Sequence, residues 1–225
     1  MPVDDPTTVV LCHYDGADES TTITDETGRS WTAYDGAKLD DAQKKFGATA
    51  LYLDGVNDYA ATADAAALQL GLTFTIDFWF YAAANTSANF RGVIDKWATN
   101  DGYAIYFPTA GSGIIGTLLG DATIFSTTQI CNSVWHHVAV CGDGTNARLF
   151  IDGTQEGSTT SIAGKSIVAS GHLLYLSGDA VSTLKNGMAI RIDELHIMKG
   201  KALYTTNFTP PPTPYGLFLP RIIMF

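Results

Sequence analysis

Short runs of alternating apolar and polar residues recur along this chain. The clearest run is 73–81, whose apolar phase holds Phe74, Ile76, Phe78 and Phe80 and whose other phase holds Thr75, Asp77 and Trp79. Successive side chains of a β-strand point to opposite faces, so a period of two predicts a strand and not a helix. Weaker runs of the same kind predict strands at 9–14, 50–53, 92–96, 103–107, 114–119, 134–141, 149–152, 173–176 and 188–198.

Between these runs, glycine, asparagine and aspartate mark tight turns. The chain has 22 glycines, and a Gly-Asp-Gly turn at 142–144 separates two expected strands, as in a hairpin. One alanine-rich stretch, 60–70, favours a helix by composition, but it is short, and a helical turn or a loop fits it better. Many strands with little helix predict an all-β fold of two packed antiparallel sheets, a jelly-roll sandwich.

The alternation changes phase in one strand near the C-terminal end. Ile190 and Ile192 share one phase, whereas Leu195 and Ile197 are one residue out of step. A β-bulge between the two pairs would return both to the core. A bulge re-aims side chains, so Asp193 is expected to point toward a loop or an ion; alternatively, it caps a turn or accepts a hydrogen bond from a backbone amide.

Composition and charge narrow the possible classes. Apolar residues make up 46% and charged residues 16% of the 225 positions, which suits one sandwich domain over 1–214 with a tail at 215–225. The net charge of −10 repels phosphate backbones and anionic lipid, which argues against a nucleic-acid partner and against binding to membrane surfaces. No apolar stretch reaches the 18 residues or more of a membrane-spanning helix, so no membrane insertion is expected.

Cysteine usage and the first residues indicate the compartment of synthesis. The three cysteines are an odd number with no metal-binding spacing, and the N-terminal stretch has no basic region followed by a long apolar one. Both observations predict a chain that is made and kept reduced in a cytoplasm.

The loop at 96–103 has the content of a sugar-binding site. Trp97 and Tyr103 are candidate stacking platforms, and Asn100 and Asp101 are candidate partners for sugar hydroxyls. The alternative is that Trp97 covers the edge of the sandwich while Asn100 and Asp101 form only a turn.

The last nine residues differ from the polar surface expected elsewhere. They contain seven apolar side chains, one proline, one arginine and no acid. Burying each large apolar side chain contributes about 1.5–3 kcal/mol, so the segment is expected to dock onto a partner subunit, as an added strand for example. The alternative is packing against its own sandwich. The candidate docking residues are Leu217, Phe218, Leu219, Ile222, Ile223, Met224 and Phe225.

The ordered set of segments resembles the laminin-G-like branch of the concanavalin A-like lectin/glucanase jelly rolls, which is common in bacteriophage and bacterial surface proteins. The matching segments are 11–16, 45–59, 74–81, 134–140, 148–154, 174–178, 190–204 and 205–212. The resemblance implies a twisted two-sheet sandwich whose concave face and loops often bind sugars or a structural calcium ion. By the same resemblance, calcium would bind where the first strand ends near the bulged last strand, through Asp15, Asp25 and Asp193.

Catalysis is not expected, although some relatives on this fold hydrolyse glycans. Such enzymes carry alternating acids of the E-x-D-x-x-E kind, because hydrolysis needs two carboxyls across one bond. This sequence lacks that pattern, and its neighbouring acids Asp193 and Glu194 would point apart unless the bulge intervenes. The adjacent His136 and His137 would face opposite sides of a strand and so could not easily share an ion.

The expected function is therefore that of a non-catalytic module on the virion surface of a phage. It would serve as a capsid decoration, head-fibre or tail component, bind a host-surface glycan, and attach to other virion proteins or to itself as a homo-oligomer. The alternatives are a free-standing carbohydrate-binding lectin module and, less favoured, a glycoside hydrolase. The placement on a virion is by family analogy, because fold alone does not fix function.

Overall fold

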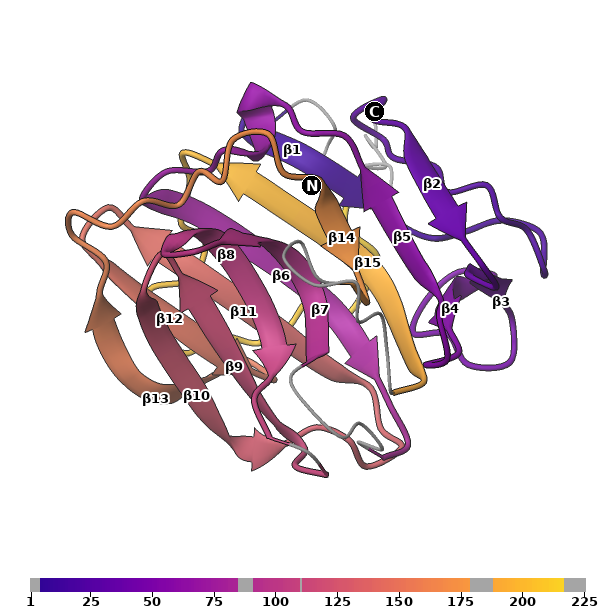
Figure 1. Cartoon of the computed structure of the whole chain (residues 1–225). Coiled ribbons are helices and arrows are strands. Elements are labelled where there is room, and N and C mark those ends of the chain that lie inside the picture. The colour runs from indigo at the N-terminus through magenta and orange to yellow at the C-terminus, as the bar shows by residue number, and fades with distance from the viewer. Residues whose placement is uncertain (1–4, 85–90, 110, 179–187, 217–225) are drawn as a thin grey trace, which may run out of the picture.

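The computed structural model describes residues 5–84, 91–109, 111–178 and 188–216, and they form two packed β-sheets (Figure 1). The eight-stranded sheet has the order β13 (Thr154–Ser161), β12 (Asn146–Ile151), β11 (His136–Asp143), β6 (Thr73–Tyr81), β15 (Ile190–Lys199), β4 (Ala50–Leu53) and β3 (Lys38–Asp40), with β1 (Thr8–Cys12) also paired to β15. The seven-stranded sheet has the order β10 (Ala122–Gln129), β9 (Ile114–Leu119), β8 (Asp101–Phe107), β7 (Arg91–Ala98), β14 (Leu174–Leu176), β5 (Tyr59–Thr62) and β2 (Trp31–Tyr34).

The predicted fold class is confirmed: the chain is an all-β sandwich of two antiparallel sheets. The one helical element among the described residues is a single 3-10 turn, η1 (Ala66–Leu68), so the alanine-rich stretch is divided between that turn and β5. No helix in the described ranges has the length and apolar character needed to cross a membrane.

The alternation in β6 decides which side chains fill the core. Phe74, Ile76, Phe78 and Phe80 are all 0% exposed and pack between the two sheets, as their phase predicted. The opposite phase is also buried, because the chain returns over the outer side of this sheet. Asp77 is 0% exposed there, although an outward-facing acid would ordinarily remain in water.

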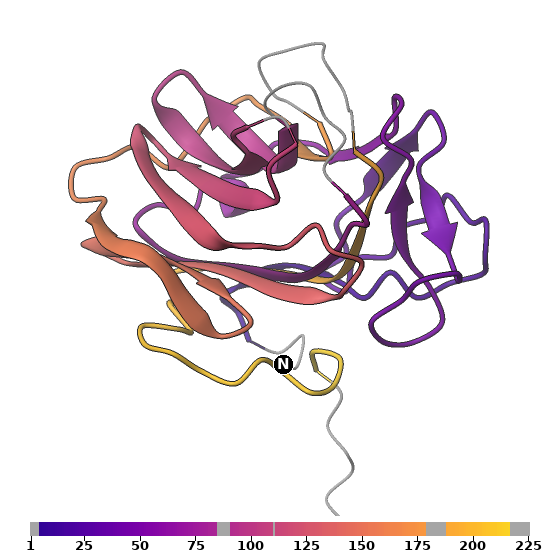
Figure 2. The ribbon, with the colours of Figure 1, turned by 90° about the horizontal axis from the view of Figure 1, so that it is seen from below.

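Residues 200–216, here called the C-terminal strap, provide that cover. Figure 2 shows the strap, in yellow, beneath the eight-stranded sheet, on the side away from β7, β8 and β9. Tyr204 and Phe208 of the strap stack with ring centroids 3.6 Å apart, and Phe208 also meets the ring of Phe150 at 5.4 Å. The backbone N–H of Phe208 donates to the carbonyl of Gly153 at 2.9 Å, which fixes the strap to the β12–β13 hairpin.

The strap reaches further than the predicted end of the domain. Tyr215 was expected to begin the tail, but it is 6% exposed and hydrogen-bonded to two acids of the sandwich. Its side chain therefore belongs with the domain. The predicted docking residues 217–225 lie outside the described residues.

The predicted bulge lies in β15. The pairing with β6 shifts register between Asp193 and His196, and Glu194 has a φ of +53°. Asp193 Oδ2 accepts hydrogen bonds from the backbone amides of Lys45 and Phe46 at 2.8 and 3.0 Å. Asp193 thus points toward the loop between β3 and β4, as the bulge predicted, and accepts hydrogen bonds from backbone amides there.

One predicted strand begins later than expected. β11 starts at His136, and Val134 lies before it with 54% of its surface exposed. Val134 therefore does not share the buried phase of Val138 and Val140, because the chain is still in the preceding loop at this point.

Candidate functional site

The predicted sugar platform at Tyr103 is wrong. Tyr103 is 0% exposed and belongs to the core cluster together with Ile105 and Phe107, the next two positions of the same phase on β8. Burial raises the pKa of its phenol well above the ordinary value. A ring enclosed on both faces cannot stack on a ligand, so Tyr103 is a structural residue.

The other three residues of that loop hold the chain together locally. The indole N–H of Trp97 donates to the carbonyl of Gly120 at 2.7 Å, and the side chain is half-buried. Asn100 is exposed with a φ of +59° in the β7–β8 turn. Asp101 accepts a hydrogen bond from the amide of Val168 at 3.0 Å. Since these contacts account for Trp97 and Asp101, the alternative of a covered edge and a turn describes the loop well.

A buried lysine completes this end of the sandwich. Lys96 is 0% exposed, and its Nζ lies 2.7 Å from Asp64, 2.7 Å from the carbonyl of Ala169 and 2.8 Å from that of His172. A buried charge is tolerated only when it is fully paired, as this one is. Lys96 therefore fixes the 163–173 loop and is not available to a ligand.

A different set of residues offers a candidate site on the outer face of the seven-stranded sheet. Strand pairing aligns seven side chains in a continuous row across all seven strands, and none of them belongs to the core cluster. A second, interrupted row lies beside it. The first row is Thr32, Ala61, Tyr175, Asp95, Ala104, Leu118 and Thr123, and the second is Tyr34, Tyr59, Gly92, Tyr106, Gly116 and Phe125.

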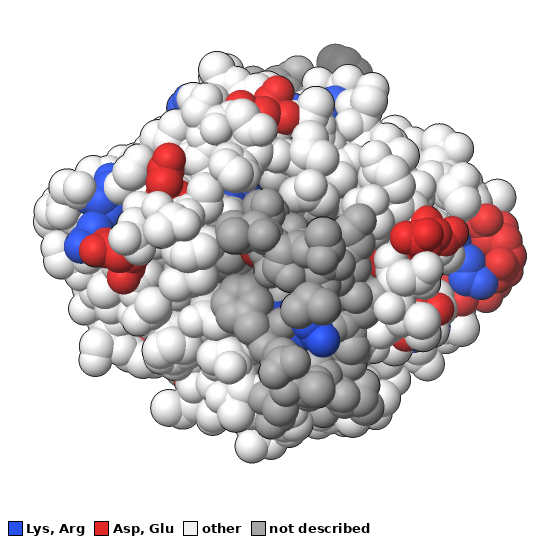
Figure 3. Space-filling view, in the orientation of Figure 1, with Lys and Arg blue, Asp and Glu red and all other residues white. Residues whose placement is uncertain are grey.

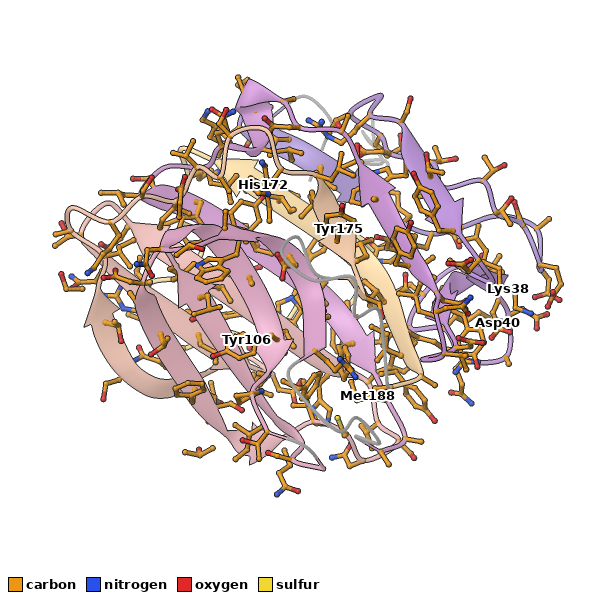
Figure 4. The ribbon with its side chains drawn as sticks, in the orientation of Figure 1. Lys38, Asp40, Tyr106, His172, Tyr175 and Met188 are labelled. Atoms are coloured by element: carbon orange, nitrogen blue, oxygen red, sulfur yellow. The ribbon has the colours of Figure 1, made fainter. Side chains whose placement is uncertain are left out.

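Three tyrosines dominate one half of this face, and we call them the tyrosine row: Tyr34, Tyr59 and Tyr175. The rings of Tyr34 and Tyr59 stack at 4.3 Å with 3° between their planes, and Tyr175 lies 6.1 Å from Tyr59. β2 is the last strand of the sheet, so one ring face of Tyr34 has no neighbouring strand, and Tyr34 is 37% exposed. Figure 4 shows Tyr175 on β14 and Tyr106 on β8 of the same sheet.

The other half of the face carries a second aromatic pair. Tyr106 and Phe125 meet edge to face at 6.4 Å, and Phe125 is 44% exposed. Gly116 lies between them in the register, and a Cβ there would be 2.8 Å from Cδ1 and Cε1 of Phe125. The glycine therefore leaves room for the phenylalanine ring over β9. Aromatic side chains thus flank both ends of the face, with small residues and Asp95 between them.

Asp95 is the single carboxylate among the strand residues of this face. It is 2% exposed, and its Oδ1 accepts a hydrogen bond from the amide of Trp97 at 2.9 Å. Hydrolysis of a glycosidic bond requires two carboxyls on opposite sides of that bond. The acid pair considered from the sequence, Asp193 and Glu194, is buried in β15 of the other sheet.

The predicted calcium ligand Asp25 already has hydrogen-bond partners on both carboxylate oxygens. Its Oδ1 accepts from the amide and hydroxyl of Thr27 at 2.9 and 2.7 Å and from the amide of Leu11 at 3.3 Å. Its Oδ2 accepts from the indole N–H of Trp31 at 3.0 Å. With both oxygens occupied by donors, Asp25 fixes the turn before β2 and does not suit a cation.

Asp15 and Asp193 hold one loop between them. Asp193 accepts hydrogen bonds from the amides of Lys45 and Phe46, and Asp15 Oδ1 accepts one from the amide of Ala48 at 2.5 Å. The second oxygen of Asp193, Oδ1, is buried without a partner, and burial raises the pKa of this carboxyl to about 7. An orphaned carboxylate oxygen fits a cation such as calcium, which binds through oxygens, so of the three predicted ligands Asp193 fits best.

Of the residues that the structure describes, the acidic side chains that do lie close enough together to hold a metal ion include none of the three predicted ligands. Asp18, Glu19 and Asp40 are the group of three found among the described residues, and they lie at the exposed end of the sandwich. Glu19 already pairs with Lys38 at 2.6 Å, and Asp40 pairs with Arg191 at 2.8 Å. These ion pairs account for the cluster.

The adjacent histidines have separate surroundings, as their alternation on a strand predicted. His136 Nδ1 lies 2.7 Å from Asp152, and its Nε2 lies 3.0 Å from Asn132. His137 is 0% exposed beneath the strap, and its Nε2 lies 2.9 Å from the hydroxyl of Tyr215. The two rings therefore do not converge on one ion.

Comparison with known proteins identifies the class. A laminin-G-type family model, described as the concanavalin A-like lectin/glucanases superfamily, matches residues 54–204. Because the match covers more than half of the chain, the protein belongs to this superfamily. A search of curated proteins gave no match.

Solved structures that resemble the chain include binding domains of clostridial toxins. The binding domain of paraclostridial mosquitocidal protein 1 aligns with a TM-score of 0.67 at 15% identity, over 88% of this chain and 50% of that one. The receptor binding domain of botulinum neurotoxin D gives 0.64 at 12% identity, over 88% and 50%. The serotype D ligand binding domain in complex with N-acetylneuraminic acid gives 0.62 at 13% identity, over 88% and 48%. The chain spans about half the length of these structures, and identities this low show a shared fold alone.

Proposed function

We propose that this protein is a non-catalytic glycan-binding module whose ligand lies on the outer face of the seven-stranded sheet. The observation that supports this most directly is the tyrosine row, in which a stacked pair of rings ends in a half-exposed Tyr34 at the sheet edge. Aromatic faces stack on pyranose rings, and phenol hydroxyls bond to sugar hydroxyls. One solved structure of the same fold is a complex with a sugar, N-acetylneuraminic acid.

The presence of a single carboxylate, Asp95, among the described strand residues of this face favours sugar binding over sugar hydrolysis. Asp95 has no second acid facing it among the described strand residues of the face, and it is almost fully buried. The proposed module therefore holds its sugar without cleaving it. Reducing-sugar release from a panel of polysaccharides, abolished in the Asp95→Asn variant, would contradict this part of the proposal.

The binding site is tested by removing its aromatic rings one at a time. Tyr34→Ala and Tyr175→Ala are each expected to weaken binding to any glycan found on a glycan array. Truncating a central aromatic contact typically costs about 2 kcal/mol or more, roughly thirtyfold in affinity. Affinity is measured by titration calorimetry, and folding is checked by thermal unfolding.

Tyr52→Ala is the matched control. Tyr52 is a half-buried tyrosine on β4 of the other sheet, where Arg191 lies over its ring at 4.3 Å. Its loss should leave glycan affinity unchanged. Equal affinity in all three variants, or no glycan bound by the wild-type protein, would reject the site.

Attachment to a larger body is a second part of the proposal. We propose that 217–225 joins the module to another subunit, to a copy of itself, or to a phage virion on whose surface it would lie, as its run of seven apolar residues suggests. The strap supports this, because Tyr215 anchors the preceding chain to Glu194 and Asp77. Deleting 217–225 should abolish assembly in analytical ultracentrifugation or on partially assembled particles, and an unchanged mass distribution would reject the attachment role.

A further inference from the structure

The outer face of the seven-stranded sheet is almost free of positive charge, and this property bears on which sugars it accepts. Among its strands, only β7 contains lysine or arginine, namely Arg91 and Lys96. Strand register pairs Arg91 with Phe107 and Lys96 with Tyr103, and both aromatic partners belong to the core. The two cations therefore project from the opposite phase to that of the tyrosine row.

Both cations already have partners of their own. The Nζ of Lys96 is enclosed by Asp64 and two carbonyls within 2.8 Å. Arg91 is half-buried, lines a small cavity with Phe107 and Met188, and already has an interaction partner. It also lies at the end of the sheet away from Lys96, beyond the register shift in β7.

Negative charge, in contrast, surrounds the tyrosine row. Asp95 is paired directly with Tyr175 across the strands, and the exposed Asp35 follows Tyr34 in the chain. Asp58 precedes Tyr59 and accepts the amides of Gly36 and Asp54 at the adjoining turns. Figure 3 shows acidic side chains gathered at the end of the molecule where the edge strand β2 lies close to β3 and β4 of the other sheet.

We infer that the tyrosine row selects neutral glycans and disfavours sugars that carry a carboxylate or sulfate. This inference rests on the proposed glycan-binding function and specifies its ligand class. A sugar carboxylate placed on the tyrosine row would meet like charge from Asp95 and Asp35, and neither aligned row of side chains contains a lysine or an arginine, so it would be bound less well than its neutral counterpart. The module would then differ in ligand class from the toxin domain of similar fold that was solved in complex with N-acetylneuraminic acid.

The test uses polysaccharides that share a backbone and differ in charge. Native gels containing hydroxyethyl cellulose or carboxymethyl cellulose, and dextran or dextran sulfate, are compared at about pH 8 and low salt. A wider panel of neutral and acidic polysaccharides is included in the same format. The neutral members are expected to retard the protein with at least tenfold higher affinity at low salt. The gap should narrow as salt rises, because salt screens repulsion between exposed charges.

Introducing a lysine on the face tests the charge selectivity independently. Thr32 is exposed and lies two residues before Tyr34 on the same face of β2, so Thr32→Lys adds a positive charge beside the stacked pair of Tyr34 and Tyr59. This variant is expected to gain affinity for the acidic polysaccharides at least threefold. Thr159→Lys is the control, because Thr159 is exposed on β13 of the other sheet and brings the same change in net charge. It should not alter the preference.

The outcomes separate the two proposals. Binding of acidic polysaccharides equal to or stronger than that of their neutral counterparts, with wild-type protein at low salt, overturns the charge selectivity and leaves the glycan site in place. An equal gain from Thr159→Lys and Thr32→Lys also overturns it, since the effect would then come from net charge. Retardation by none of the neutral or acidic polysaccharides overturns the proposed glycan-binding function itself.

Discussion

The hydroxyl of Tyr215 donates a 2.6 Å hydrogen bond to the carboxylate of Asp77, a residue 138 positions earlier in the chain. The same hydroxyl lies 2.9 Å from Nε2 of His137, so it can accept one hydrogen bond while it donates the other. The carboxylate of Asp77 also forms hydrogen bonds with His196 Nδ1 at 3.1 Å and with the hydroxyl of Tyr204 at 3.1 Å. Three hydrogen bonds, with His137 Nε2 a further 3.6 Å away, thus satisfy an acid that is entirely removed from water.

Tyr215→Phe should destabilise the protein by about 1.5–3 kcal/mol, because a hydrogen bond to a buried charge is lost and no water replaces it. The ring and its packing against His196 are retained, which isolates the hydroxyl. Urea unfolding measures the change in the free energy of unfolding. Tyr34→Phe is the control, since Tyr34 is partly exposed and its hydroxyl can turn to solvent. Equal stability of the two variants would contradict the bond to Asp77.

Acid should weaken the attachment of the strap through Asp77. Burial alone would raise the pKa of this carboxyl, but hydrogen bonds with His137 and His196 and their charges hold it well below its ordinary value. Since the folded-state pKa is lowered, Asp77 contributes stability above the ordinary carboxyl pKa of about 4, and that contribution is lost as pH falls below it.

Asp77→Asn should therefore cost about 3–5 kcal/mol at neutral pH, as loss of one member of a buried charged network does, and should flatten the pH dependence between about pH 5 and 2. Melting temperatures over this range provide the measurement. The exposed Asp35→Asn variant should keep the wild-type profile. A profile for Asp77→Asn as steep as that of the wild type would assign the acid sensitivity to other groups.

Asp193 should show the opposite pH dependence and a response to calcium. Burial raises its pKa to about 7, so in the absence of a cation its contribution is favourable at low pH and is lost as pH rises from about 4 through 7. If calcium binds the orphaned Oδ1, adding it should raise the melting temperature more at about pH 8 than at pH 5, because protons compete for the carboxylate.

Asp193→Asn should abolish the calcium response, whereas Asp25→Asn should destabilise the protein equally with calcium and with chelator. The second variant is the control, because both oxygens of Asp25 already accept hydrogen bonds. A melting temperature that is the same in calcium and in chelator at both pH values would show that calcium does not bind at Asp193.

Gly153→Ala should loosen the strap. Gly153 has a φ of +78°, and a Cβ there would be 1.9 Å from the carbonyl oxygen of Phe208. The left-handed backbone alone costs about 1–2 kcal/mol for a residue with a side chain, and the strap must also shift. Hydrogen exchange should accelerate at Phe208, whose amide bonds to Gly153.

Gly164→Ala separates backbone strain from displacement of the strap. Gly164 has a φ of +75°, and a Cβ there would have no atom within 4 Å. This variant should carry the strain without accelerating exchange at Phe208. Similar exchange at Phe208 in both variants would show that the close contact at Gly153 is unimportant.

The strands that could be predicted are those with long apolar runs of constant phase. The bounds of β6, β4 and β9 agree with the sequence pattern, because one side of each is packed in the core. β13 was not predicted, since its exposed residues are mostly threonine, serine and glutamine. β10 has only Ala122 and Ile124 as core residues, too few to mark a strand.

The candidate site shows the same division. The core position of Tyr103 could be predicted, because it shares the phase of Ile105 and Phe107 within one strand. The tyrosine row could not, because Tyr34 and Tyr59 become neighbours only through the pairing of β2 with β5, two short strands without an apolar pattern. Side chains that meet across strands depend on register, which a single sequence specifies weakly where strands are short.

The strap also gives the molecule two unlike poles. The outer side of the eight-stranded sheet is covered by the aromatic rings of the strap, and the outer face of the seven-stranded sheet, which carries the tyrosine row, is on the opposite side of the molecule (Figure 2). Chain that continues past Gly216 therefore starts from the closed pole. Anything tethered there would sit behind the module and leave its open pole turned outward, an arrangement that suits a molecule bridging a carrier and a sugar-coated surface.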